Sequence, residues 1–273
     1  MKVAVIPTAD AVTKESVVNK SVVMFDILRA SSTISTALAN GCKEVIPVVE
    51  VEDAFAVAKT LSENTFIIGG ERGALKVPGF HLGNSPLEYT ADVVSGKTVI
   101  LTTTNGTKAT SRAAAGASQV FIGSLLNISA LARRIMEQGK DVVLVCAGTR
   151  GKFSLDDTLA AGMMVRELVQ LWRNRPDAPA STIQVAEQNK PGVVYLDEVP
   201  VISGHALVLE DAAVAALRLA EAYLDNPLRG LYDCLHGQKL AQLGFAADLA
   251  YCAQVDILDV VPVYQDGKII IER

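Results

Sequence analysis

Four segments of the sequence place acids, basic side chains, hydroxyls and glycines directly after short apolar runs. They are residues 26–33 (DILRASST), 69–73 (GGERG) followed by 79–86 (GFHLGNSP), 102–107 (TTTNGT) and 147–157 (AGTRGKFSLDD). Arginines and the backbone amides at helix starts bind phosphate oxygens, whereas carboxylates hold a divalent cation such as Mg²⁺. The inventory therefore suits a phosphorylated acid held together with a magnesium ion.

Each of these residues also has an ordinary structural interpretation. Asp26 could cap its own loop, and Arg29 could be a surface charge. Thr102–Thr107 could combine strand propensity with an Asn-Gly turn. Acids at Asp156 and Asp157 would favour the first turn of a helix through its dipole. The prediction therefore depends on the convergence of the four segments and not on any single residue.

Several phosphate-handling motifs are absent from the sequence. There is no GxxxxGK[ST] loop and no GxGxxG after a strand. No arginine stands six residues after any of the cysteines, and Leu28 occupies the place of the second acid in an aspartyl-phosphate DxD motif. The three histidines fall in no metal-ligand spacing, which favours structural roles. Water activated by a metal is the mechanism that this pattern favours, with a covalent intermediate on Asp26 as the alternative.

The elements that must position these loops alternate between strand and helix. Apolar runs of strand length are Val3–Pro7, Val22–Phe25, Val45–Val49, Thr65–Ile68, Thr98–Leu101, Val120–Ile122 and Val142–Cys146. Helical periodicity marks Thr33–Ala39, Glu52–Ser62, Pro86–Val94, Lys108–Ala115, Ile128–Gln138 and Leu155–Trp172. Alternation of this kind predicts a three-layer α/β/α fold with a mostly parallel or mixed sheet, whose loops meet at the carboxyl ends of the strands.

The chain is predicted to form one domain, residues 1–273, with two similar halves around a shared cleft. The halves are placed at 1–96 and 97–273, because residues 31–48 and 106–123 follow the same strand, loop and helix pattern. A segment at 173–209 without clear periodicity reads as an insertion. C-terminal helices and a hairpin around Asp266-Gly267 are expected to complete the fold.

Composition excludes several other classes of function. The 273 residues carry a formal net charge of −5 without a basic block, so no nucleic-acid or membrane-surface role is expected. The uncharged stretch between Arg112 and Arg133 is interrupted by polar residues and does not read as a membrane span. Four scattered cysteines and the lack of a recognisable signal peptide predict a reduced, cytoplasmic protein.

Taken together, the motifs resemble the 2-phosphosulfolactate phosphatase family over nearly the whole chain and in order. The matching residues are 25–34 (FDILRASSTI), 70–73, 79–86, 102–107, 146–148, 153–157, Gly162, His236-Gly237, and the tail with Asp248, Tyr251, Cys252 and Asp256 before Val261-Pro262. The resemblance implies Mg²⁺-dependent hydrolysis of (2R)-phosphosulfolactate to sulfolactate and phosphate, a step in coenzyme M biosynthesis. For family members outside that pathway, the resemblance implies that the substrate is another phosphorylated acid. The sequence departs from the family pattern at residues 173–209.

The combined interpretation assigns roles to particular residues. Catalysis is expected of Asp26, Arg29, Glu71 and Asp156, and Mg²⁺ binding of Asp26, Glu71 and Asp157. Binding of the small anionic phosphorylated substrate is expected of Ser31, Ser32, Arg72, Asn84, Ser85, Thr104, Asn105, Gly106, Thr107 and Gly148. A non-catalytic binder of a phosphorylated metabolite is the alternative function, and a homo-oligomer is compatible with either.

Overall fold

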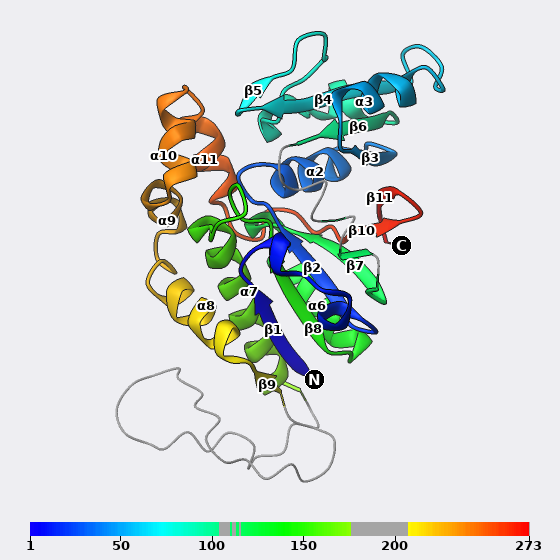
Figure 1. Cartoon of the computed structure of the whole chain (residues 1–273). Helices are drawn as coiled ribbons and strands as arrows, with labels where there is room; N and C mark the ends of the chain where they lie inside the picture. Colours follow the sequence, from blue (N-terminus) through cyan, green and yellow to red (C-terminus); the bar gives the residue numbers. More distant parts are fainter. Residues whose placement is uncertain (104–109, 111–112, 115, 176–206, 273) are drawn as a thin grey trace.

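The structure is a computed structural model, and it describes residues 1–103, 110, 113–114, 116–175 and 207–272. Its strands are β1 (Lys2–Ile6), β2 (Ser21–Phe25), β3 (Glu44–Val48), β4 (Phe66–Arg72), β5 (Leu75–Lys76), β6 (Thr98–Thr102), β7 (Gln119–Gly123), β8 (Val142–Cys146), β9 (Val208–Leu209), β10 (Pro262–Gln265) and β11 (Lys268–Ile271). They form an 11-stranded sheet in the order β5-β4-β6-β3-β11-β10-β7-β2-β8-β1-β9 (Figure 1).

The sheet consists of two parallel groups joined by the C-terminal hairpin. Strands β7, β2, β8, β1 and β9 are paired in parallel, and so are β3, β6 and β4. Between the groups, β10 pairs antiparallel with β7 and β11 pairs antiparallel with β3. The hairpin expected at the end of the chain is therefore confirmed, and it lies in the middle of the sheet.

Helices cover both faces of the sheet. The α-helices are α1 (Lys14–Val17), α2 (Ala30–Ala39), α3 (Val51–Ala58), α4 (Ala91–Val94), α6 (Ile128–Gln138), α7 (Leu155–Arg173), α8 (Asp211–Glu221), α9 (Pro227–Asp233), α10 (Leu235–Gln242) and α11 (Ala246–Cys252). Short 3₁₀ turns are η1 (Ala9–Ala11), η2 (Pro86–Glu88) and η3 (Leu125–Asn127). No helix in these described parts is both long and apolar enough to cross a bilayer.

Strand β2 shows why the sheet needs a helical layer on each side. All five of its residues are buried. Val23 and Phe25 belong to an apolar cluster with α6, α7 and α8, whereas Val22 and Met24 point to the opposite face and pack in a cluster with α2. A strand apolar on both faces is stable only when both faces are covered. The expected three-layer α/β/α fold is confirmed.

The predicted elements agree with the observed ones, with one informative difference. All seven expected strands are present, and helix α6 has the predicted bounds. The helix expected at Pro86–Val94 is instead divided into η2 and α4, because Tyr89 leaves the helical backbone conformation and donates its buried hydroxyl proton to the Gly83 carbonyl at 2.7 Å. The helix expected at 108–115 falls mostly outside the described residues.

Candidate active site

A cavity of about 330 Å³ lies where loops from both parallel groups of the sheet meet. It is lined by Asp26, Leu28, Arg29, Glu71, Gly73, Ala74, Asn84, Thr103, Thr149, Arg150, Leu235, His236 and Lys239. These residues come from the ends of β2, β4, β6 and β8, from the segment between β5 and η2, and from helix α10. Four of the predicted site residues, Asp26, Arg29, Glu71 and Asn84, are therefore brought together at one place.

Two acidic residues, Asp26 and Glu71, line this cavity. Asp26 follows β2, and its loop is closed by two hydrogen bonds to Ser31, whose hydroxyl accepts from the Asp26 amide at 3.2 Å and whose amide donates to the Asp26 carbonyl at 2.8 Å. Glu71 is buried at the end of β4, where its Oε2 accepts from the Ala74 amide at 2.7 Å. The Asp26 backbone and the Glu71 carboxylate are thus held in place by the protein itself.

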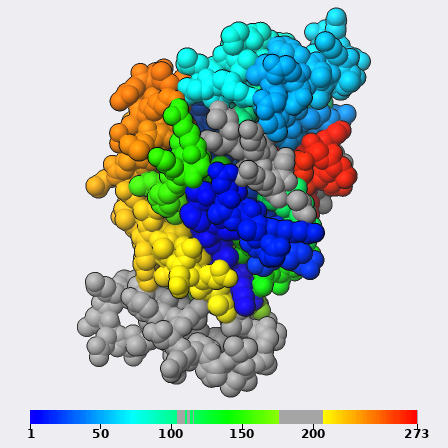
Figure 2. All heavy atoms as spheres, viewed as in Figure 1, coloured from blue at the N-terminus to red at the C-terminus, as the bar shows by residue number. Residues whose placement is uncertain are grey.

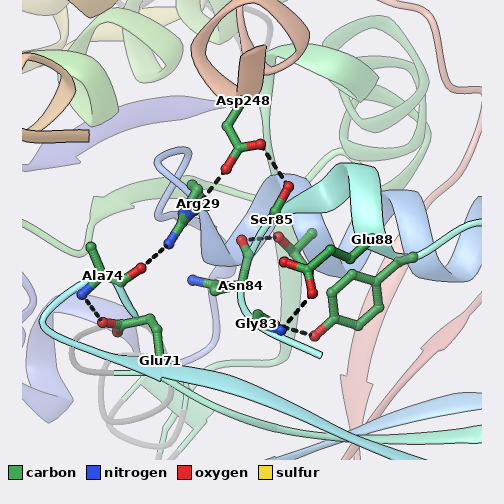
Figure 3. Close-up of polar contacts among 10 residues, drawn as sticks. Arg29, Glu71, Ala74, Gly83, Asn84, Ser85, Glu88 and Asp248 are labelled. Carbon is green, nitrogen blue, oxygen red and sulfur yellow. Dashed lines mark hydrogen bonds and ion pairs between the residues drawn. The ribbon is translucent and has the colours of Figure 1, made fainter. Parts of the chain in front are cut away.

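Arg29 is not a surface charge, because it is 3% exposed and ion-paired. Its Nη1 donates to Asp248 Oδ2 at 2.7 Å, and its Nη2 donates to the Ala74 carbonyl at 2.7 Å (Figure 3). The guanidinium also stacks over the Phe245 ring at 4.2 Å from its centroid. Ser85 donates to Asp248 Oδ1 at 2.6 Å, which satisfies the other carboxylate oxygen. Arg29 therefore lines the cavity as an anchored group.

Two buried polar atoms, on residues that line the cavity, have no hydrogen-bond partner among the described residues. They are Asn84 Oδ1 and Thr103 Oγ1, on residues that are 4% and 5% exposed. Figure 3 shows the Asn84 side chain among Arg29, Glu71 and Ser85. Leaving a buried polar atom unsatisfied costs roughly 1–3 kcal/mol, so such atoms point to a ligand or ion that completes them. Thr103 was not among the predicted residues, although it lies one position before the predicted Thr104.

Asp156 and Asp157 are buried in the first turn of α7 and do not line the cavity. Asp157 ties two site loops together, since its carboxylate oxygens accept from the amides of Ile27 and Gly148, each at 3.0 Å. Burial, together with the neighbouring Asp156 and Asp26, raises the pKa of Asp157 well above its usual range. Asp156 accepts a short hydrogen bond from Ser154. Asp157 therefore holds the loops after β2 and β8 together, whereas Asp156 binds Ser154 at the start of its own helix.

The remaining predicted residues also make contacts within the protein. The Ser32 hydroxyl donates to the Ile27 carbonyl at 2.9 Å. Arg72 donates to the carbonyls of Glu71 and Val49, each at 2.8 Å, and so joins β4 to the end of β3. Thr104, Asn105, Gly106 and Thr107 lie outside the described residues.

Sequence reasoning missed most of the wall that helix α10 provides. His236 and Lys239 line the cavity, although the histidines had been given structural roles. Burial lowers the pKa of His236, opposed by the Asp156 charge and by a hydrogen bond with the Leu28 backbone. The pairing of His236 with Gly237 in the family motif was the one available signal. Burial raises the pKa of the Cys146 thiol well above its usual range, and Cys146 packs in the apolar cluster that contains α7.

The donors at the cavity are suitable for a magnesium ion. Mg²⁺ commonly takes one or two protein carboxylates and completes its shell with water and substrate oxygens. Asp26 and Glu71 would supply two carboxylates, and Asn84, which lines the same cavity, would supply a further oxygen through its Oδ1. Asp157 fits less well, because both of its oxygens already accept backbone hydrogen bonds. Within the described residues, no three side chains of the His, Cys, Asp and Glu types form a preassembled metal cluster.

The fold and the cavity together define a three-layer α/β protein with a polar site, lined by acids and bases, at the ends of its strands. The chain belongs to the 2-phosphosulfolactate phosphatase family, whose model matches residues 6–267. It is 40% identical over 264 residues to a protein of Caldanaerobacter subterraneus subsp. tengcongensis, covering 95% of this chain and 94% of the relative. The resemblance found in the sequence is confirmed.

Other relatives match over similar lengths. A protein of Symbiobacterium thermophilum is 38% identical over 257 residues, covering 94% of this chain and 96% of the relative. One from Clostridium novyi is 38% identical over 269 residues, covering 98% and 99%. All three relatives carry the name probable 2-phosphosulfolactate phosphatase.

Proposed function

We propose that this protein is a Mg²⁺-dependent phosphatase that hydrolyses 2-phosphosulfolactate, or a closely related phosphorylated hydroxy acid, to the hydroxy acid and phosphate. Membership of the family supports the reaction. The observation that carries the assignment to this site is that Asp26, Glu71, Asn84 and Thr103 line one cavity, and that Asn84 Oδ1 and Thr103 Oγ1 have no partner among the described residues.

Different residues of the cavity would have different roles in hydrolysis. Asp26 and Glu71 would hold the magnesium ion, which when bound supplies positive charge against the phosphate oxygens. Asp26 would orient the attacking water and accept its proton. Arg29 keeps N–H donors beyond the two that bind Asp248 and Ala74, and these would stabilise the charge on the equatorial phosphate oxygens during in-line attack. The Thr103 hydroxyl would donate to the substrate.

Phosphate release from a panel of phosphorylated hydroxy acids, with and without Mg²⁺, tests the proposed function. We expect release from 2-phosphosulfolactate, loss of turnover on exhaustive chelation with EDTA, and recovery on addition of excess Mg²⁺. The physical reason is that two carboxylates facing a phosphate need a hard, oxygen-liganded cation between them. Full turnover after chelation would contradict the metal assignment. Saturable binding of the whole panel without release would favour the non-catalytic binder.

A further inference from the structure

We propose that Arg150 and Lys239 form a second anion subsite in the cavity, which binds the sulfonate of the substrate and so determines specificity. The inference rests on the proposed function, because it assumes a substrate with an anionic group apart from its phosphate. Neither residue was among those predicted from the sequence. Both line the cavity, Arg150 from the loop between β8 and α7 and Lys239 from helix α10.

The backbone around Arg150 is built to hold that residue in an unusual conformation. Thr149 and Lys152 exchange two backbone hydrogen bonds, of 2.9 and 3.1 Å, across a two-residue turn formed by Arg150 and Gly151. The φ angles of the turn residues are +54° and +72°. Glycine adopts such angles readily, whereas an arginine does so at a cost, and costs of this kind concentrate at functional sites. The turn therefore places Arg150 at the cavity in an energetically unfavourable backbone conformation.

Gly148 allows this turn to lie close to the chain that follows it. Its φ is +75°, and a Cβ atom at this position would come within 2.6 Å of the Lys152 carbonyl oxygen. The Gly148 amide is fixed by Asp157 at 3.0 Å. The base of the turn is thus anchored to α7, which limits the range of positions that the Arg150 side chain can sample.

Lys239 approaches the same cavity from a separate element. It lies three residues after His236 on α10, so the two side chains share one helix face, and both line the cavity. Figure 2 shows the β8–α7 loop, in green, standing beside the orange helices of the C-terminal region. Two cationic groups from different elements therefore face one space.

The positive charge of these two residues is not used elsewhere in the described structure. Among the described residues, neither the Arg150 nor the Lys239 side chain has an ion-pair or hydrogen-bond partner. Arg29 differs, because Asp248 neutralises it at 2.7 Å. The cavity thus contains one arginine whose charge is neutralised within the fold, and two cations whose whole charge remains available to an anion.

Of the anionic groups of the proposed substrate, the sulfonate is the one that we expect to bind Arg150 and Lys239. The carboxylate and the phosphate ester share one carbon atom, so the carboxylate stays near the phosphate. The sulfonate is attached one carbon further away and can reach a separate wall. Its charge is spread over three oxygens, which can accept donors from two directions at once. Arg150 and Lys239, which belong to different elements, supply donors of that arrangement.

Three substrates and three variants test this subsite. The substrates are 2-phosphosulfolactate, 2-phospholactate, which lacks the sulfonate, and 1-sulfopropan-2-yl phosphate, which lacks the carboxylate. We expect Arg150→Gln and Lys239→Gln each to lower kcat/KM by about ten- to a hundredfold on the two sulfonates, mainly through KM, since each variant removes a charge-assisted hydrogen bond. Turnover of 2-phospholactate should change less than about twofold. Lys152→Gln is the matched control, because it removes the same charge from the same loop at an exposed position outside the cavity lining.

The outcomes separate this inference from the proposed function. Equal losses on all three substrates, or losses only on the two carboxylates, would overturn the sulfonate subsite while leaving the phosphatase intact. If the wild-type protein releases no phosphate, the proposed function fails, and calorimetric titration with sulfolactate and lactate still tests the subsite. Sulfolactate should bind the wild type more tightly than either variant, whereas lactate should bind all three proteins with similar affinity. Equal affinity of the three proteins for sulfolactate would overturn the sulfonate subsite. Thermal melts verify folding, and Lys239→Gln serves if Arg150→Gln disturbs its turn.

Discussion

At the scale of single residues, charged groups around the cavity differ in how far the protein itself satisfies them. Arg29 and Asp248 form a buried pair, whereas Asp157 is committed to two backbone amides. The Glu71 carboxylate and the Asp26 backbone are held by contacts within their own loops, and both residues line the cavity. Substitutions of these residues should therefore separate into effects on stability and effects on turnover.

Asp26→Asn should remove turnover while leaving the fold intact. The substitution keeps the side-chain shape but removes the charge that would hold the metal and accept the proton of water. We expect kcat to fall by at least about a hundredfold, the size typical of losing a positioned base or charge-stabilising group. Steady-state kinetics and thermal melts measure the two effects. Asp225→Asn, at an exposed position outside the cavity lining, is the control, and a destabilised but fully active Asp26→Asn would show that Asp26 only caps its loop.

Arg29→Met should lower stability in addition to removing the phosphate donors proposed above, because it leaves the Asp248 carboxylate buried without its partner. Breaking a buried ion pair by removing one member costs roughly 3–5 kcal/mol. The double variant Arg29→Met with Asp248→Leu should recover much of that loss, since neither charge of the pair remains. Urea unfolding of both variants measures the difference.

The exposed pair of Arg133 and Asp259 provides the comparison for this experiment. Its side chains are 53% and 86% exposed, and their separation, 2.7 Å, matches that of the buried pair. Arg133→Met should change the free energy of unfolding by no more than about 1 kcal/mol. Equal costs at the two arginines would show that burial does not control the strength of the pair.

At the scale of elements, the packing of α7 against α8 positions the acids of the site. Gly162 lies in α7 where a Cβ atom would come within 2.0 Å of the Ala216 carbonyl of α8. Only a residue without a side chain permits this approach. The N-terminal turn of α7 carries Asp157, which ties together the loops after β2 and β8, so the helix contact bears on the site.

Gly162→Ala therefore offers a test in which two effects have opposite signs. Helix propensity alone predicts that alanine stabilises a helix interior by about 0.5–1 kcal/mol relative to glycine. The close approach to Ala216 predicts a destabilisation of roughly 1–3 kcal/mol, the usual cost of overpacking. We expect the second effect to dominate in urea unfolding. A more stable variant would contradict the helix packing described above.

At the scale of the whole molecule, the hairpin near the C-terminus unites the two parallel groups of strands. Ile269 in β11 is fully buried opposite Val45 of β3, only a few residues from the end of the chain. Ile269→Ala should lower the free energy of unfolding by about 2–5 kcal/mol, because it opens a cavity at the junction. Ile271→Ala, in the same strand at a 37% exposed position, should cost much less. Similar costs for both would show that the hairpin contributes little to the sheet.

The sequence by itself determined the local elements, because strand and helix periods are short-range signals. Five apolar residues in a row at Val142–Cys146 indicated a buried strand, and Ile128–Gln138 showed a helical period that the structure reproduces. The loops carrying Asp26 and Glu71 were likewise identified, since polar groups that follow strands gather at the carboxyl ends of a sheet.

Only the tertiary structure decided which of these groups meet. Arg29 is paired with Asp248, 219 residues away, and no local pattern encodes a contact at that separation. Lys239 and Arg150 line the same cavity because α10 lies beside the β8–α7 loop. Asp157 does not line that cavity, and its carboxylate accepts hydrogen bonds from two backbone amides. Period and propensity fix the element that a residue occupies, whereas the side chains that surround it depend on how all the elements pack.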